Sequence, residues 1–183
     1  RGHPVRVEVH VDNGLPAFNV VGLPDASCKE ARDRVRAALV SSGFAWPSRR
    51  ITVNLAPTGV PKAGAVLDLP MAVGLLVACG EVEPTSIEGM AFLGELGLDG
   101  SVRPIPGALP LVDAVEVDVV VVAPDNADEA RLVTPKVAHP IPDLRSLVLA
   151  LRGEEPWPET GSPTPEAVAL DEPDLADVRG QRM

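Results

Sequence analysis

Valine occupies five of the six positions from Val117 to Val122. A strand with one wet face alternates apolar and polar residues, whereas a strand buried on both faces carries a nearly continuous apolar run. The run therefore predicts a buried strand of the kind found in parallel sheets. Parallel strands need crossover connections, and short helical patterns flank the run over residues 107–115 and 126–132. The predicted fold class is mixed α/β.

The N-terminal part of the chain predicts more strands around one helix. Apolar and polar residues alternate over residues 5–11, which predicts a half-buried strand. The apolar run Ala17–Gly22 follows an Asn-Gly turn signal and is predicted to be the hairpin partner of that strand. Ser27 and Glu30 have the spacing of a capping box at the start of a helix. The β-branched segment Arg50–Ala56 predicts a third strand.

Residues Leu67–Cys79 are nearly all apolar, which predicts a buried helix. Pro70 falls in its first turn, where a missing N–H costs little. Asp68 lies at the N-terminus of this helix, and its carboxylate is predicted to cap the unpaired N–H groups there. Both cysteines, Cys28 and Cys79, are predicted to be buried apolar side chains.

The remaining patterns complete the order ββαβαββαβαβα. Residues 91–105 predict a hairpin that turns at Asp99-Gly100. Residues 137–141 predict an edge strand, because Pro140 cannot donate to a ladder. Residues 143–151 predict the last helix.

Charge divides the chain into two parts. Residues 153–183 hold eight acidic and two basic side chains together with five prolines, whereas residues 1–152 hold 18 acidic and 14 basic side chains. Charge and proline without apolar periodicity are typical of a linker. We therefore expect a body at 1–152 and an acidic, proline-rich linker at 153–183.

Composition excludes several classes of protein. No stretch approaches 18 uninterrupted apolar residues and no secretory signal pattern opens the chain, so neither a membrane partner nor export is expected. Two cysteines make no disulfide framework and point to a reducing, cytoplasmic compartment. The formal net charge of −10 argues against wholesale coating of nucleic acid, and the scarcity of aromatic residues argues against base-stacking platforms.

The glycine-containing loop Thr58–Gly64 is a weak match to a phosphate cradle. Pro61 removes one backbone donor and Ala63 stands where a hydroxyl residue would hold Mg²⁺, so a structural turn is the better interpretation. The three histidines and two cysteines have no metal-ligand spacing. No serine lies in a nucleophile-elbow pattern. The chain itself is therefore predicted to hold no cofactor and no metal.

Basic residues cluster on the first predicted helix and just before the third predicted strand. A solvated helix face explains such a cluster, and a phosphate-contacting surface is the alternative. The candidate contacts to DNA or to a partner are Arg32, Arg36, Arg49 and Arg50, with Arg34 in the same cluster.

Two segments resemble Lon-type proteases. Pro61–Val66, which opens a buried helix, resembles the loop of the catalytic serine, and Leu93–Ile105 resembles the hairpin that leads to the catalytic lysine. Lon-type peptidases use a Ser–Lys dyad in which the amine takes the proton of the serine hydroxyl. Carried onto this sequence, the dyad falls on Val66 and Leu109, which are both aliphatic. The resemblance implies a Lon-like fold, of the ribosomal-protein-type β-α-β kind, that is catalytically inactive.

The chain more closely resembles the N-terminal domain of ComM/YifB-type magnesium-chelatase-like AAA+ ATPases. Residues Asp174–Gln181 are similar to the entry into the ATPase module of these proteins, whose Walker A and Walker B segments do not occur in the 183 residues. The segments of the body that carry the resemblance are Phe18–Asp25, Ile51–Pro57, Leu67–Ala72 and Leu93–Ile105.

This resemblance implies a non-catalytic accessory domain followed by an ATPase module in the same polypeptide. The longer protein would bind ATP and Mg²⁺, form a homo-oligomeric ring such as a hexamer, and act on DNA as a branch-migration helicase in natural transformation. Two alternatives stay open. One is a stand-alone nucleotide-binding or small-molecule kinase-like enzyme with Lys62 and Asp68 as its polar groups, and the other is a DNA-binding module that uses the arginines.

Overall fold

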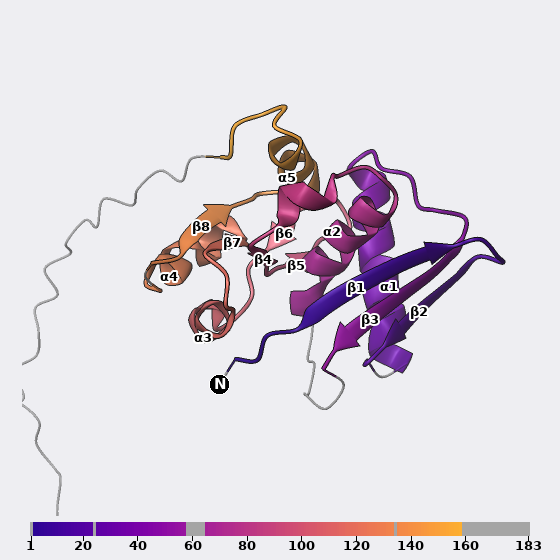
Figure 1. The fold of residues 1–183 in the computed structure, drawn as a ribbon, viewed down its shortest axis with the longest axis horizontal. Coiled ribbons are helices and arrows are strands. Elements are labelled where there is room, and N and C mark those ends of the chain that lie inside the picture. The colour runs from indigo at the N-terminus through magenta and orange to yellow at the C-terminus, as the bar shows by residue number, and fades with distance from the viewer. Residues whose placement is uncertain (1, 24, 58–64, 134, 159–183) are drawn as a thin grey trace, which may run out of the picture.

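The computed structural model describes residues 2–23, 25–57, 65–133 and 135–158. Its elements form two three-stranded sheets and one short hairpin, with helices packed against them (Figure 1). The mixed α/β class is therefore confirmed. Within these residues, none of the helices has the length and apolar character that crossing a bilayer requires.

The first sheet contains β1 (Arg6–Asp12), β2 (Ala17–Val21) and β3 (Arg50–Ala56) in the order β1-β3-β2. The predicted half-buried strand and the predicted bounds of β3 are confirmed. The predicted pairing of β1 with β2 is wrong: β3 lies between them, antiparallel to β1 and parallel to β2. The Asn-Gly turn reverses the chain, but β1 and β2 both pair with β3, which begins about 30 residues after β2. Local turn chemistry cannot indicate that pairing.

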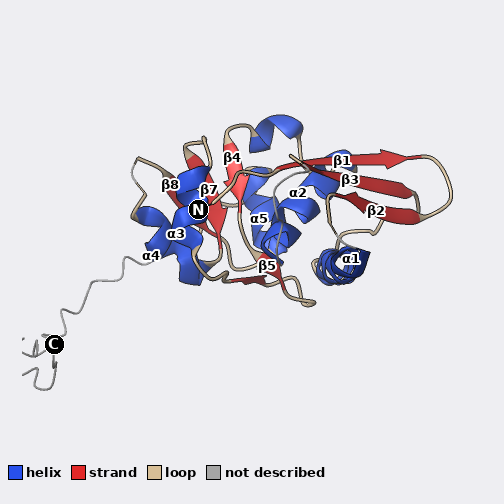
Figure 2. Cartoon of the chain, turned by 90° about the horizontal axis from the view of Figure 1, so that it is seen from below, coloured by secondary structure: helices blue, strands red, loops and turns tan. Residues whose placement is uncertain are grey.

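Helices α1 (Asp25–Ser41) and α2 (Asp68–Ala78) pack together beside this sheet, with a 3₁₀ turn at Ala65–Leu67 before α2 (Figure 2). The apolar face of α1 is buried as predicted, and α2 is the predicted buried helix with Pro70 in its first turn. The predicted capping box is wrong, because α1 begins at Asp25 and Ser27 is already inside the helix.

The second sheet is parallel and contains β4 (Met90–Phe92), β7 (Val119–Val122) and β8 (Val137–Pro140) in the order β4-β7-β8. The valine run is its central strand and β8 is an edge, as predicted. A separate hairpin pairs β5 (Glu95–Leu96) with β6 (Val102–Arg103), so the segment expected as one hairpin arm from residue 91 divides between two sheets.

Three short helices complete the second half: α3 (Ala108–Ala114), α4 (Ala127–Arg131) and α5 (Leu144–Leu151). 3₁₀ turns lie at Pro84–Ile87 and Pro124–Asn126. One large apolar core joins α1, α2, α5 and the first sheet, and a smaller one lies between α3, α4 and the second sheet.

Candidate functional site

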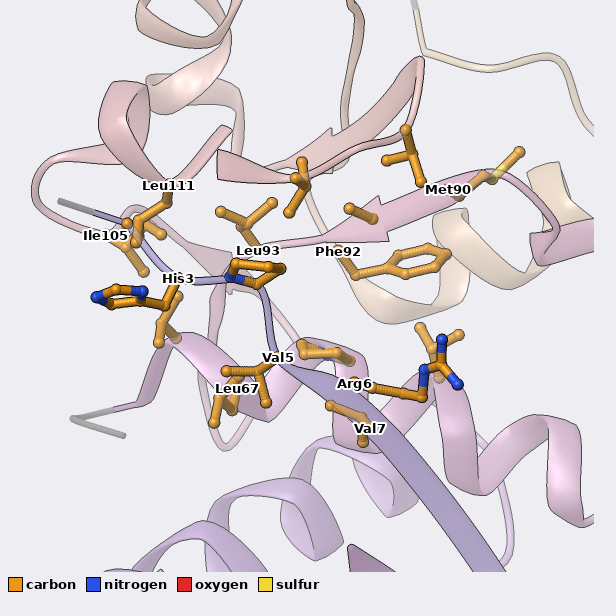
Figure 3. A pocket seen from close by; sticks show the side chains of 18 of the residues that line it. His3, Val5, Arg6, Val7, Leu67, Met90, Phe92, Leu93, Ile105 and Leu111 are labelled. Carbon is orange, nitrogen blue, oxygen red and sulfur yellow. The ribbon is translucent and has the colours of Figure 1, made fainter. Parts of the chain in front are cut away.

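An apolar groove of about 880 Å³ lies where the N-terminal segment, the start of α2, β4 and α3 meet (Figure 3). β1 and β4, which both contribute to its wall, are edge strands of their sheets. Apolar side chains from all four elements face it, including Val5, Leu67, Phe92, Leu93 and Leu111.

The position that the Lon resemblance gives to the catalytic serine lies in this groove. Val66 belongs to the 3₁₀ turn before α2 and lines the groove wall, and it is half-buried against both apolar cores. Leu109, at the lysine position, lies in the first turn of α3, is 36% exposed and does not line the groove. Its backbone N–H donates to Glu129 Oε1 at 2.9 Å.

The polar side chains that line the groove are His3, Arg6, Glu95 and Glu116. Among the described lining residues there is no serine, threonine, cysteine or lysine. Nucleophilic catalysis needs one of these groups beside a base that activates it. The groove can therefore hold apolar groups, but its described wall supplies no side chain for acyl transfer of the Ser–Lys kind.

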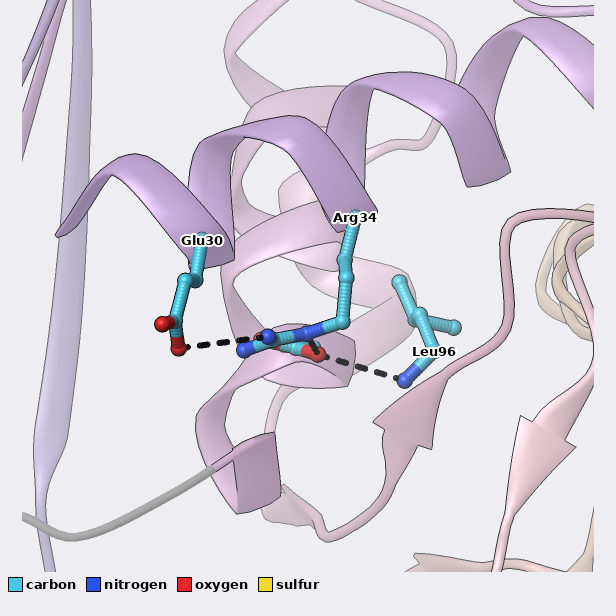
Figure 4. Close-up of polar contacts among 4 residues, drawn as sticks. Glu30, Arg34 and Leu96 are labelled. Atoms are coloured by element: carbon cyan, nitrogen blue, oxygen red, sulfur yellow. Dashed lines mark hydrogen bonds and ion pairs between the residues drawn. The ribbon is translucent and has the colours of Figure 1, made fainter. Parts of the chain in front are cut away.

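Behind the groove, Arg34 of α1 reaches Asp68 at the first position of α2 (Figure 4). Arg34 Nε donates to Asp68 Oδ2 at 2.6 Å and Arg34 Nη2 donates to Oδ1 at 3.1 Å. The N–H of Leu96 on β5 also donates to Oδ2 at 3.4 Å. The Asp68 side chain is fully buried, and it connects two helices and the hairpin. The prediction that Asp68 caps α2 is wrong, because its oxygens accept from other elements.

Burial of Asp68 and its pairing with Arg34 shift the pKa of its carboxyl in opposite directions. Burial raises the pKa of the Asp68 carboxyl above its ordinary value, and the hydrogen bonds and charge of Arg34 oppose that rise. The same hydrogen bond raises the pKa of Arg34, so its guanidinium stays charged. The arrangement is a structural ion pair, in which the charged form of the Asp68 carboxyl is stabilised by Arg34.

Comparison with known proteins decides the family. A family model described as "Subunit ChlI of Mg-chelatase" matches residues 7–126. The chain belongs to this magnesium-chelatase ChlI family.

Full-length relatives in the ChlI family are much longer than this chain. It is 40% identical over 185 residues to the uncharacterized protein YifB of Salmonella typhimurium, an alignment that covers 97% of this chain and 35% of YifB. It is 38% identical over 184 residues to the competence protein ComM of Haemophilus influenzae, covering 97% and 36%. An uncharacterized protein of Mycobacterium tuberculosis is 42% identical over 186 residues, covering 98% and 36%. The chain thus spans about a third of these relatives.

The candidate arginines of this ChlI-family chain lie at two places. Arg32 and Arg36 are one turn apart on α1, where Arg32 pairs with Asp33 at 2.8 Å and Arg36 is exposed. Arg49 and Arg50 are exposed at the start of β3. No ion pair within the described ranges engages Arg36, Arg49 or Arg50. Arg34, which the sequence groups with these residues, points instead to Asp68.

Other candidate groups do not converge. The Thr58–Gly64 loop, with Lys62, lies outside the described residues. Within the described ranges, no three His, Cys, Asp or Glu side chains gather as a metal site. The prediction that both cysteines are buried is wrong for Cys79, which is exposed at the end of α2, whereas Cys28 is half-buried.

Sequence reasoning missed two features of the site. The groove forms from segments between residues 2 and 117, and no local pattern indicates that they meet. The partner of Asp68 lies 34 residues earlier in the chain. In the sequence, the pairing is indicated only by the position of Arg34 on the first predicted helix, directly before Val35 of the buried apolar face.

Proposed function

We propose that residues 1–152 are a non-catalytic, Lon-like N-terminal accessory domain of a longer magnesium-chelatase-like AAA+ ATPase. Residues 153–183 are the linker toward the ATPase module of the same polypeptide. The observation that carries this proposal is the groove, where an aliphatic side chain, Val66, takes the place that the resemblance gives to a nucleophile. Membership of the ChlI family and the greater length of the relatives support the rest.

ATP and Mg²⁺ belong, in this proposal, to the module beyond residue 183. The longer protein assembles as a homo-oligomeric ring, a hexamer, in the cytoplasm. The accessory domain shapes that ring, contacts a partner or controls entry of the substrate.

DNA is the substrate that we propose for the motor, through branch migration in natural transformation. The name of the Haemophilus influenzae relative, a competence protein, supports this choice. The exposed arginines Arg36, Arg49 and Arg50, with Arg32, are the residues that we propose for contact with DNA or a partner. This part of the proposal is independent of the groove.

The test of the non-catalytic role is a set of three assays on the 183-residue chain. Peptidase activity on an unfolded protein substrate and labelling by a fluorophosphonate serine probe are measured together with ATP hydrolysis. We expect all three at background. Turnover above background that disappears in the Lys62→Ala variant would overturn the proposal in favour of the kinase-like alternative, and serine labelling would overturn it in favour of a peptidase.

A further inference from the structure

The described part of the chain continues beyond α5 over residues 152–158, which we call the exit segment. α5 ends at Leu151, and Gly153 adopts the left-handed conformation (φ +70°) that closes a helix without strain. The Gly153 N–H donates to Ala150 O at 3.0 Å, and the Glu154 N–H donates to Leu149 O at 2.9 Å. The chain therefore folds back on α5 as it leaves the helix.

An ion pair attaches the start of the exit segment to the turn that follows α2. Arg152 Nε donates to the backbone oxygen of Glu81 at 2.7 Å, and Arg152 Nη2 lies 2.6 Å from Glu81 Oε2. Glu81 is the third residue after the end of α2 at Ala78. The contact is bidentate, and such geometry fixes the orientation of arginine more firmly than a single ion pair does.

An aromatic stack attaches the other end. The Trp157 indole lies on the His139 imidazole of β8, with ring centroids 4.3 Å apart and an interplanar angle of 22°. Trp157 also packs against the large apolar core. His139 is in register with Val121, which is fully buried in that core. The stack therefore lies on the edge strand β8, beside the buried central strand β7.

We propose that the exit segment is an anchored strap, and that the Trp157–His139 stack sets the point at which the rest of the chain leaves the body. The departure point is then β8 rather than the end of α5. This goes beyond the proposed function and does not depend on it, because it concerns only how residues 152–158 attach to the body.

Anchoring changes what the following residues can reach. An extended chain spans at most about 3.5 Å per residue. Ser162 lies four residues beyond Pro158. If Pro158 is held in place on the body, Ser162 can move no more than about 14 Å from that fixed point. If the chain were attached only at Arg152, the limit would be ten residues, or about 35 Å.

The experiment measures this confinement in the 183-residue chain by double electron–electron resonance. Nitroxide labels are placed on Asp113→Cys, an exposed position of α3, and Ser162→Cys, after Cys28 and Cys79 are changed to serine. We expect a narrow distance distribution that broadens at least twofold in Trp157→Ala and in His139→Ala. Thermal unfolding of each variant confirms that the body remains folded.

Conservative changes separate anchoring from a general loss of stability. Trp157→Phe and His139→Phe keep a ring on each side of the stack, and we expect them to retain the narrow distribution. His10→Ala, an exposed histidine on β1, is the matched control and should leave it unchanged. A distribution of equal width in the parent chain and in both alanine variants would overturn the proposal, as would broadening in His10→Ala as large as in His139→Ala.

Discussion

The guanidinium of Arg34 donates two hydrogen bonds, of 2.6 and 3.1 Å, to the carboxylate of Asp68 across the contact between α1 and α2. Arg34 retains 24% exposure of its side chain, whereas Asp68 has none. The two partners are therefore unequal. Arg34 can turn toward water if the pair is broken. Among the described residues, Asp68 has only Arg34 and the Leu96 N–H to replace its lost hydration.

Removing the carboxylate should destabilise the fold. In Asp68→Ala the Leu96 N–H loses its acceptor and Arg34 loses its partner, and breaking a buried ion pair from one side costs about 3 kcal/mol. We expect a loss of that size in the free energy of unfolding, measured by urea denaturation. Asp33→Ala, which breaks the exposed pair with Arg32, is the control and should change stability by less than about 0.5 kcal/mol. Equal losses in the two variants would contradict a buried role for Asp68.

Removing the arginine should make stability depend on pH. Burial raises the pKa of Asp68 and Arg34 opposes that rise, so Arg34→Ala leaves a folded-state pKa well above the unfolded value of about 3.9. The folded variant then binds a proton more tightly than the unfolded chain, and its stability falls as pH rises through the raised pKa. Measured against the parent chain, the loss should be larger at pH 8 than at pH 5.

The control for this pH effect is Arg34→Ala combined with Asp68→Asn, which has no carboxyl to titrate at this position. Its stability difference from the parent chain should vary little between pH 5 and pH 8. A deficit of Arg34→Ala that stays constant over the same range would show that Asp68 is not the titrating group.

Gly74 of α2 lies where β1 crosses the helix. A Cβ at this position would sit 2.6 Å from Val9 Cγ2, and the β-branched valine has little freedom to move aside. Helix propensity alone favours Gly74→Ala by about 1 kcal/mol, but overpacking costs about 1–3 kcal/mol. We expect a net loss of stability in urea, and recovery when Val9→Ala is added. A gain of stability from Gly74→Ala alone would contradict the close approach.

Much of the fold follows from patterns that lie within one element. The alternation in β3 and the valine run of β7 predict strands, because burial on one face selects apolar residues at alternate positions and burial on both faces selects them at nearly every position. Which strands pair with one another is not visible in such local patterns. β3 separates β1 from β2 because a strand after α1 inserts between them, and that outcome depends on how the helix packs rather than on the turn.

The candidate site is predictable in chemistry but not in geometry. The aliphatic character of Val66 and Leu109 is visible in the sequence, whereas the groove around Val66 needs the fold to bring together the N-terminal segment and β4. The stack between His139 and Trp157 joins residues that separately look like an isolated histidine and part of an acidic linker. Long-range pairing of this kind depends on the tertiary structure alone.

Restoring the serine should not restore a peptidase. In Val66→Ser the hydroxyl enters the groove wall, but a Ser–Lys dyad also needs an amine within hydrogen-bond reach. Leu109 supplies none and does not line the groove. We expect no reaction with a fluorophosphonate probe above that of the unsubstituted chain. Stoichiometric labelling of Val66→Ser would show that another residue activates the hydroxyl and that the groove retains catalytic machinery.

The exposed arginines give the proposed DNA contact a test of its own. Each lost phosphate contact should weaken binding at all sequences and lower the slope of log affinity against log salt concentration by about 1. We expect Arg50→Glu, at the start of β3, to do so in fluorescence anisotropy with a labelled duplex. Arg145→Glu, which reverses an exposed arginine on α5, makes the same change in net charge and should have little effect. If the chain shows no affinity for DNA at low salt, or if the two reversals weaken binding equally, then these residues do not form a DNA-contacting surface, and the solvated-face interpretation holds for them.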